Sequence, residues 1–194
     1  MRDLVARLKQ ALPAAVDWVA QLEVIYRPQS FTPADAGPAR LAEYYPAALL
    51  ERARFVLLDT LPFPPVSELG LPEFEAMAAM PKAGIAFGST YFLARAHASE
   101  GTHFHELVHV VQWAELGLAG FLEAYAISIV QHGYDGSAFE MMASRLQARY
   151  ERGEPIPDAV DIIRAHALET ASRTRRIVEA HGARQGGERG DERR

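Results

Sequence analysis

The stretch FHELVHVVQW, residues 104–113, limits the fold more than any other part of the sequence. It is apolar enough to form the buried stripe of a helix, yet it carries two histidines and a glutamate. His105 and His109 are four positions apart, so in a helix both imidazoles leave the same face, one turn apart. Glu106 is rotated by about 100° from His105. Burying three such groups is costly unless strong partners compensate them. The fold must therefore supply hydrogen-bond partners or a metal ion at this helix.

The spacing of these residues favours the metal ion. Two imidazole nitrogens one turn apart can converge on one ion at about 2.0–2.1 Å each. Glu106 lies beside that direction and can reach a metal-activated water as its base. The alternative is that both histidines pack in the core with hydrogen-bonded ring nitrogens. Gln112 shares their helix face and either contacts a ligand or substrate or only borders the site. His103 is about 200° away from His105 and is not expected to join.

A catalytic zinc ion usually has three protein ligands and a water, so a third ligand is needed. The candidates further along the chain are Glu115, Glu123, His132 and Glu140. Glu115 is directed away from the two histidines on the same helix. If residues 102–116 and 120–132 form two antiparallel helices, Glu123 lies about 10 Å along the axis from His109. Glu140 begins the next helix, where the helix dipole favours a carboxylate. We prefer Glu140 and keep Glu123 and His132 as alternatives.

The apolar periodicity predicts an α+β chain that is mostly helical. Helices are expected over 4–19 with Pro13 as a kink or boundary, over 40–54 with Tyr45-Pro46 as its break or true start, and over 102–116, 120–132, 138–151 and 158–181. Ser99 or Thr102 is expected to cap the histidine helix, and Ser137 the helix after Gly133. Strands are expected over 53–59 and 83–96, the latter as one strand or as a pair bent at Gly88-Ser89. Residues 28–38 and 61–72 should be irregular.

One domain is predicted over residues 1–182, with its motif core at about 83–151. Residues 183–194 are polar, charged and glycine-rich, and we expect a disordered tail. The net charge of −5 and the lack of a basic cluster before the last quarter argue against nucleic acid as a partner. The absence of cysteine excludes disulfides and thiolate-bound zinc. No secretory signal and no run of about 18 apolar residues is found, so we expect a cytoplasmic protein with no membrane span.

The stretch FHELVHVVQW, with GIAFGSTYFLARA (84–96) before it and GFLEAYAISIVQHGYDGSAFEMMA (120–143) after it, resembles a group of bacterial HExxH proteins. These are zincin-type metallopeptidases, related in pattern to the gluzincins. The resemblance covers about residues 83–150. It implies a zincin-like core with a small sheet before the HExxH helix, one zinc ion held by His105, His109 and Glu140, and Glu106 as catalytic base. This chain departs from the pattern at Ser137-Ala138-Phe139, where a proline and an aliphatic residue usually precede the glutamate.

We therefore expect a zinc-dependent hydrolase that cleaves peptide bonds in a peptide or protein substrate. Glu106 would take a proton from water and return it to the leaving amine. Tyr134, Tyr125 and His132 are candidates for stabilising the transition state. Each could equally be a packed side chain whose polar tip is hydrogen-bonded within the protein. The alternatives are a non-catalytic protein, with structural zinc or as a helical interaction module, and hydrolysis of a non-peptide amide. The sequence leaves the oligomeric state open.

Overall fold

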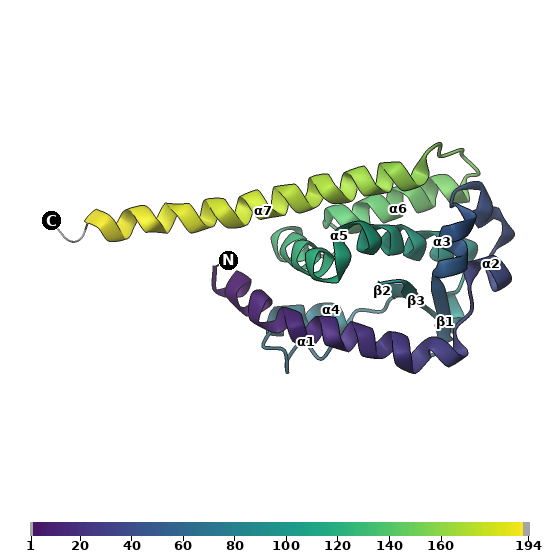
Figure 1. Cartoon of the computed structure of the whole chain (residues 1–194), viewed down its shortest axis with the longest axis horizontal. Coiled ribbons are helices and arrows are strands. Elements are labelled where there is room, and N and C mark those ends of the chain that lie inside the picture. The colour runs from purple at the N-terminus through teal and green to yellow at the C-terminus, as the bar shows by residue number, and fades with distance from the viewer. Residues whose placement is uncertain (1, 192–194) are drawn as a thin grey trace.

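The computed structural model describes residues 2–191, and they form a mostly helical protein with one small sheet (Figure 1). The long helices are α1 (Arg2–Tyr26), α5 (Glu100–His132), α6 (Ala138–Glu151) and α7 (Ala159–Asp191). Short helices are α2 (Pro33–Ala36), α3 (Ala47–Arg52) and α4 (Glu75–Ala79), with single 3-10 turns at Arg27–Gln29, Ala39–Glu43, Pro72–Phe74 and Arg95–His97. The predicted α+β class is confirmed at this level.

The sheet has three strands, β1 (Arg54–Leu58), β2 (Gly84–Phe87) and β3 (Thr90–Ala94), in the order β1-β3-β2. β1 runs parallel to β3, and β2 pairs with β3 in the antiparallel direction. Gly88 joins β2 to β3 with φ +62°, a conformation that glycine adopts at no steric cost. The tight pair bent at Gly88-Ser89 is therefore the correct one of the two sequence alternatives.

Helix α5 carries the HELVH motif and consists of two helical parts that meet at Gly117. The backbone of Gly117 is not helical (φ 69°, ψ 167°). Trp113 and Phe121 are eight residues apart, about 12 Å along a straight helix, yet their ring centroids are 4.3 Å apart. The chain therefore folds back at Gly117, as the two predicted helices require. Ser99 caps the start by accepting a hydrogen bond from the backbone N–H of Thr102, and Gly133 (φ 75°) ends the helix.

The core surrounds the first part of α5. Phe104, Leu107 and Val108 are fully buried, and α5 as a whole packs against the sheet, α1, α6 and α7. The side chain of Trp113 donates to the carbonyl of Ala86 in β2 at 3.2 Å, which fixes the helix to the sheet. Figure 1 shows α1 and α7 on opposite sides of α5. A second apolar cluster lies under α1, where it meets the segment 63–77 and the second part of α5.

Several predicted boundaries differ from the structure. α1 runs through Pro13, so a boundary there is wrong. Pro13 is exposed, and water can donate a hydrogen bond to the helix carbonyl that the missing N–H leaves free. The segment 28–38 contains the short helix α2, which Thr32 caps. Tyr45-Pro46 interrupts the helix predicted over 40–54, because the 3-10 turn Ala39–Glu43 lies before it and α3 begins after it. The helix α4 lies in a stretch for which no helix was predicted.

The last helix of the structure is longer than predicted. α7 continues to Asp191, beyond the predicted helix end at 181, and residues 192–194 lie outside the described residues. The division into a domain and a tail at 182–183 stays a prediction.

Among the described helices, only α5 is long and apolar enough to cross a membrane, a test that the core helix of a protein also passes. The cytoplasmic location stays a prediction.

Candidate metal centre

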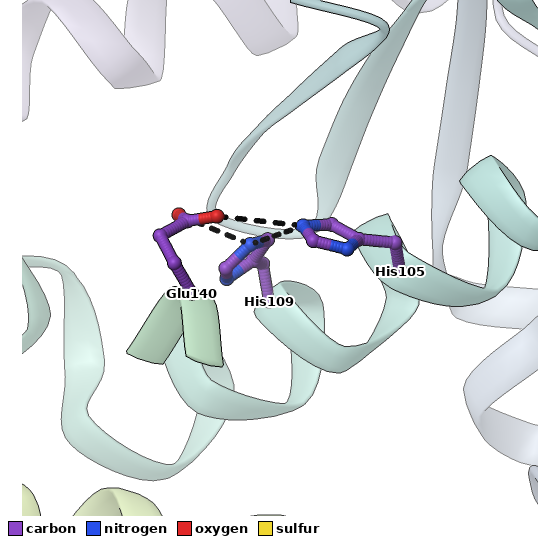
Figure 2. Close-up of side chains that lie close together, drawn as sticks. All are labelled: His105, His109 and Glu140. Atoms are coloured by element: carbon purple, nitrogen blue, oxygen red, sulfur yellow. Dashed lines mark hydrogen bonds and ion pairs between the residues drawn. The ribbon is translucent and has the colours of Figure 1, made fainter. Parts of the chain in front are cut away.

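The two histidines of the HELVH motif meet a carboxylate from the next helix. His105 and His109 project from the first part of α5, and Glu140 comes from the first turn of α6 (Figure 2). Their candidate ligand atoms all lie within 4.8 Å of one another. The two Nε2 atoms are 3.1 Å apart, and the Glu140 oxygens lie 3.5 Å from Nε2 of His105 and 3.3 Å from Nε2 of His109. These three side chains could hold one metal ion, and we call them the metal group.

The position of Glu140 depends on how α6 begins. Ser137 occupies the N-cap position, as predicted, but its hydroxyl makes no capping bond. It donates instead to the hydroxyl of Ser128 at 3.1 Å, and the backbone N–H of Ala138 also donates to Ser128. Ser128 belongs to the second part of α5. The start of α6 is therefore attached to α5 itself, which fixes the Glu140 carboxylate relative to both histidines.

Two glutamines orient the histidine rings. The Oε1 atom of Gln112 lies 2.9 Å from Nδ1 of His109, and the Oε1 atom of Gln147 lies 3.0 Å from Nδ1 of His105. An amide oxygen can only accept, so both Nδ1 atoms carry the proton. Each Nε2 atom then keeps its lone pair for a ligand at the centre. Gln112 is fully buried and donates to the carbonyl of Phe139, so it contacts the metal group from behind and does not face the cavity.

Glu140 receives a further hydrogen bond, from the phenol of Tyr125 to Oε1 at 2.5 Å. Burial opposes the ionisation of Glu140, but the neighbouring His109 and His105 hold the pKa of this carboxyl well below its usual value. Burial likewise opposes a charge on His109, yet the Glu140 carboxylate raises the pKa of that imidazole. In both cases the attraction between the Glu140 carboxylate and the imidazoles outweighs the cost of burying a charge. The centre therefore attracts positive charge, which either a proton or a metal cation can supply.

Glu106 lies next to this centre and is not one of its ligands. It is buried, and its Oε2 atom has no hydrogen-bond partner. Burial raises the pKa of Glu106 to about 8, although the nearby His105 lowers it. Gly84 in β2 makes room for this side chain, because a Cβ at that position would lie 2.5 Å from Oε1 of Glu106. A buried carboxyl without a partner is rare and indicates a group that a ligand or water completes.

The other candidate residues are placed as follows. Tyr134 lines the same cavity as Glu106, and burial and the Glu140 charge raise its pKa. His132 is exposed near the end of α5, away from the three-residue group. Glu123 lines the cavity and is not part of that group either. Glu115 pairs with Arg164 at 3.6 Å, and His103 shares a 2.8 Å hydrogen bond with Tyr91, so neither joins the metal group, as expected.

Two further residues, Gln147 and Gly84, help to position the site and were not predicted. Gln147 is seven residues after Glu140, which places both on one face of α6, two turns apart. That spacing repeats the relation of Gln112 to His105 and was an available signal. Gly84 carried only the weak signal of a glycine inside a strand, which often marks a close approach of another group.

The comparisons with known proteins give no relative. No protein-family model, no curated protein and no solved structure matches this chain. Any functional conclusion therefore depends on the residues themselves.

Proposed function

We propose that the protein is a zinc-dependent hydrolase, a metallopeptidase with a zincin-like core and one zinc ion per chain. The observation that carries this proposal is the combination of a His105, His109 and Glu140 group with an unpartnered, buried Glu106 beside it. Two histidines and one glutamate form a known ligand set of catalytic zinc, which keeps a further position open. The same donors also suit iron(II). The carboxylate adjacent to the ligands favours zinc and hydrolysis.

The distances support a tetrahedral ion. Two ligand atoms that are each about 2.0–2.1 Å from a tetrahedral ion lie about 3.3 Å apart. The two Nε2 atoms are 3.1 Å apart, and the distances to Glu140 are 3.3 Å from His109 to Oε1 and 3.5 Å from His105 to Oε2. These separations are close to the spacing of ligand atoms around one such ion, so the side chains need little movement to bind.

The chain's own residues have distinct tasks in this proposal. Bound zinc would supply Lewis acidity and lower the pKa of water. Glu106 accepts the proton of the attacking water and returns it to the leaving amine. Its burial makes it a stronger base than an exposed glutamate, since burial raises its pKa to about 8. Gln112 and Gln147 keep the imidazoles in the tautomer that offers Nε2.

Tyr134 and Tyr125 both interact with Glu140, and they differ in how closely they do so. The Tyr125 phenol is committed to Glu140, so it positions a ligand. Tyr134 lines the cavity next to Glu106 and is the better candidate to donate to the developing oxyanion. β2 is an edge strand that also lines the cavity, which suits an extended peptide as substrate.

The test is hydrolysis of a mixed peptide library by zinc-loaded protein, compared with Glu106→Gln. Glutamine keeps the size of the side chain but cannot act as a base. We expect the variant to bind zinc as the wild type does and to lose at least a hundredfold in rate, the lower range for general acid–base catalysis. Equal zinc content and equally absent cleavage in both proteins would support the non-catalytic zinc protein instead.

A further inference from the structure

A cavity of about 130 Å³ adjoins the metal group, and the proposed hydrolysis does not by itself explain the apolar residues of its wall. Glu106, His109, Tyr125, Tyr134 and Glu140 line the end of the cavity that carries the site. Most of the remaining wall is apolar. It comes from α1, from the segment 63–77, from β2 and from the second part of α5.

Helix α1 contributes one continuous face to this wall. The lining residues on α1 are Leu8, Ala11, Leu12, Ala15, Trp18 and Val19. Their spacing of three and four positions is that of a single helix face. Two alanines lie in the middle of this face, where larger apolar side chains would reduce the cavity. The neighbouring Ala14 is exposed on another face of the same helix.

The segment 63–77 closes the wall from a second direction with Phe63, Val66, Leu71 and Phe74. Lys82 also borders the cavity, but its ammonium group already donates to the carbonyls of Met77 and Met80 and lies 4.9 Å from the centre of the Phe63 ring. The cation is therefore partnered. Glu123 is the other charged residue on the wall, and the rest of the wall away from the metal group is apolar. That surface selects for an apolar group, because a polar group would lose its hydration against it.

We propose that this cavity receives a bulky apolar group of the substrate, attached next to the amide that is cleaved. This inference rests on the proposed zinc hydrolase function and names its substrate class. An apolar cavity of about 150 Å³ accommodates benzene in another protein, so this one fits a leucine or phenylalanine side chain or a short alkyl chain. The Ala11 and Ala15 positions on α1 set how large that group can be.

Alkyl hydroxamates test the inference without requiring turnover, because the hydroxamate head binds zinc and the tail probes the cavity. We would measure the dissociation constants of acetohydroxamate through octanohydroxamate for zinc-loaded protein by calorimetry. Affinity should rise about fourfold per buried methylene, the equivalent of about 0.8 kcal/mol, until the cavity is full. A 6-hydroxyhexanohydroxamate control, whose tail is polar but uncharged, should bind less tightly than hexanohydroxamate.

Ala15→Leu narrows the cavity, and Ala14→Leu is its matched control on the exposed face. We expect Ala15→Leu to remove most of the gain from long tails while acetohydroxamate binding stays within twofold, and Ala14→Leu to behave as the wild type. Zinc-dependent binding of acetohydroxamate with no gain from longer tails would overturn this inference and leave the hydrolase proposal standing. An equal change in long-tail affinity in Ala15→Leu and Ala14→Leu would also overturn the inference and leave the hydrolase proposal standing. Failure of the wild type to take up zinc would overturn both.

Discussion

The two sides of the metal group are built in opposite ways. On the ligand side (His105, His109, Gln112, Glu140 and Gln147), each side chain has a hydrogen-bond or ion-pair partner within the protein. On the cavity side (Glu106, Gly84, Tyr134 and the apolar wall), a buried carboxyl oxygen has no partner. In the proposed hydrolase this difference would separate two tasks. Side chains that would hold the ion must not move, whereas the side chain that would take a proton from water must keep polar capacity for it.

Removing a ligand should have the largest effect. Glu140→Gln keeps the side-chain size but replaces the anionic donor, and we expect zinc affinity to fall by more than the 10–100-fold typical of an outer-shell partner. The matched control is Glu123→Gln, which changes the third-ligand alternative that lines the cavity without joining the metal group. Competition titration against a chelator of known affinity measures both. An equal loss in the two variants would contradict the ligand side as described.

The next effect concerns the cavity side alone. Gly84→Ala places a Cβ 2.5 Å from Oε1 of Glu106, so the glutamate must shift. A displacement of about 1 Å in a catalytic group costs on the order of a hundredfold in rate. We expect peptidase activity to fall by about that factor while zinc affinity is unchanged.

Gly120→Ala is the control for this substitution, because its Cβ would meet only Leu116 at an ordinary 3.7 Å. It should leave the rate unchanged and raise the stability of α5 slightly, since alanine is the better helix former. A full rate in Gly84→Ala would show that Glu106 is not held where the chemistry needs it.

Loss of an orienting glutamine should have a smaller effect, now on the ligand side. Gln147→Leu leaves Nδ1 of His105 without its acceptor, so the ring and its tautomer are no longer fixed. We expect zinc affinity to fall by about 10–100-fold, the usual range for a partner of a ligating histidine. Gln10→Leu on the exposed face of α1 is the control. Unchanged zinc affinity in Gln147→Leu would remove the glutamines from the account.

The smallest effect separates stability from the site. Ser99→Ala removes the N-cap of α5 and should lower the free energy of unfolding by ~1 kcal/mol, measured by urea denaturation. Zinc affinity of the folded protein should stay within twofold, because the cap lies more than one turn before His105. A large loss of zinc affinity would mean that the ligand side depends on the helix end as well as on its own hydrogen bonds.

Several helix ends were predictable because single residues near them favour a cap or a break. The start of α6 at Ala138, the ends of α5 at Ser99 and Gly133 and the break at Gly117 all carry local signals, namely a cap residue or a glycine. The path through Pro13 did not, because a proline's cost depends on whether water reaches the freed carbonyl. Local sequence does not state that exposure.

The site was predictable where residues share one helix and harder where they do not. The shared direction of His105 and His109 follows from helix geometry alone. The choice of Glu140 over Glu123 and His132 needed the arrangement of two helices. The Gln147 and Gly84 contacts needed the packing of α6 and β2 against α5, which no spacing within one element specifies.

The central claim is that His105, His109 and Glu140 bind one zinc ion, and native mass spectrometry of metal-depleted protein during zinc titration tests it most directly. We expect uptake of one tightly bound zinc per chain and its loss in His105→Ala. No uptake by the wild type, or the same uptake in His105→Ala, would contradict it.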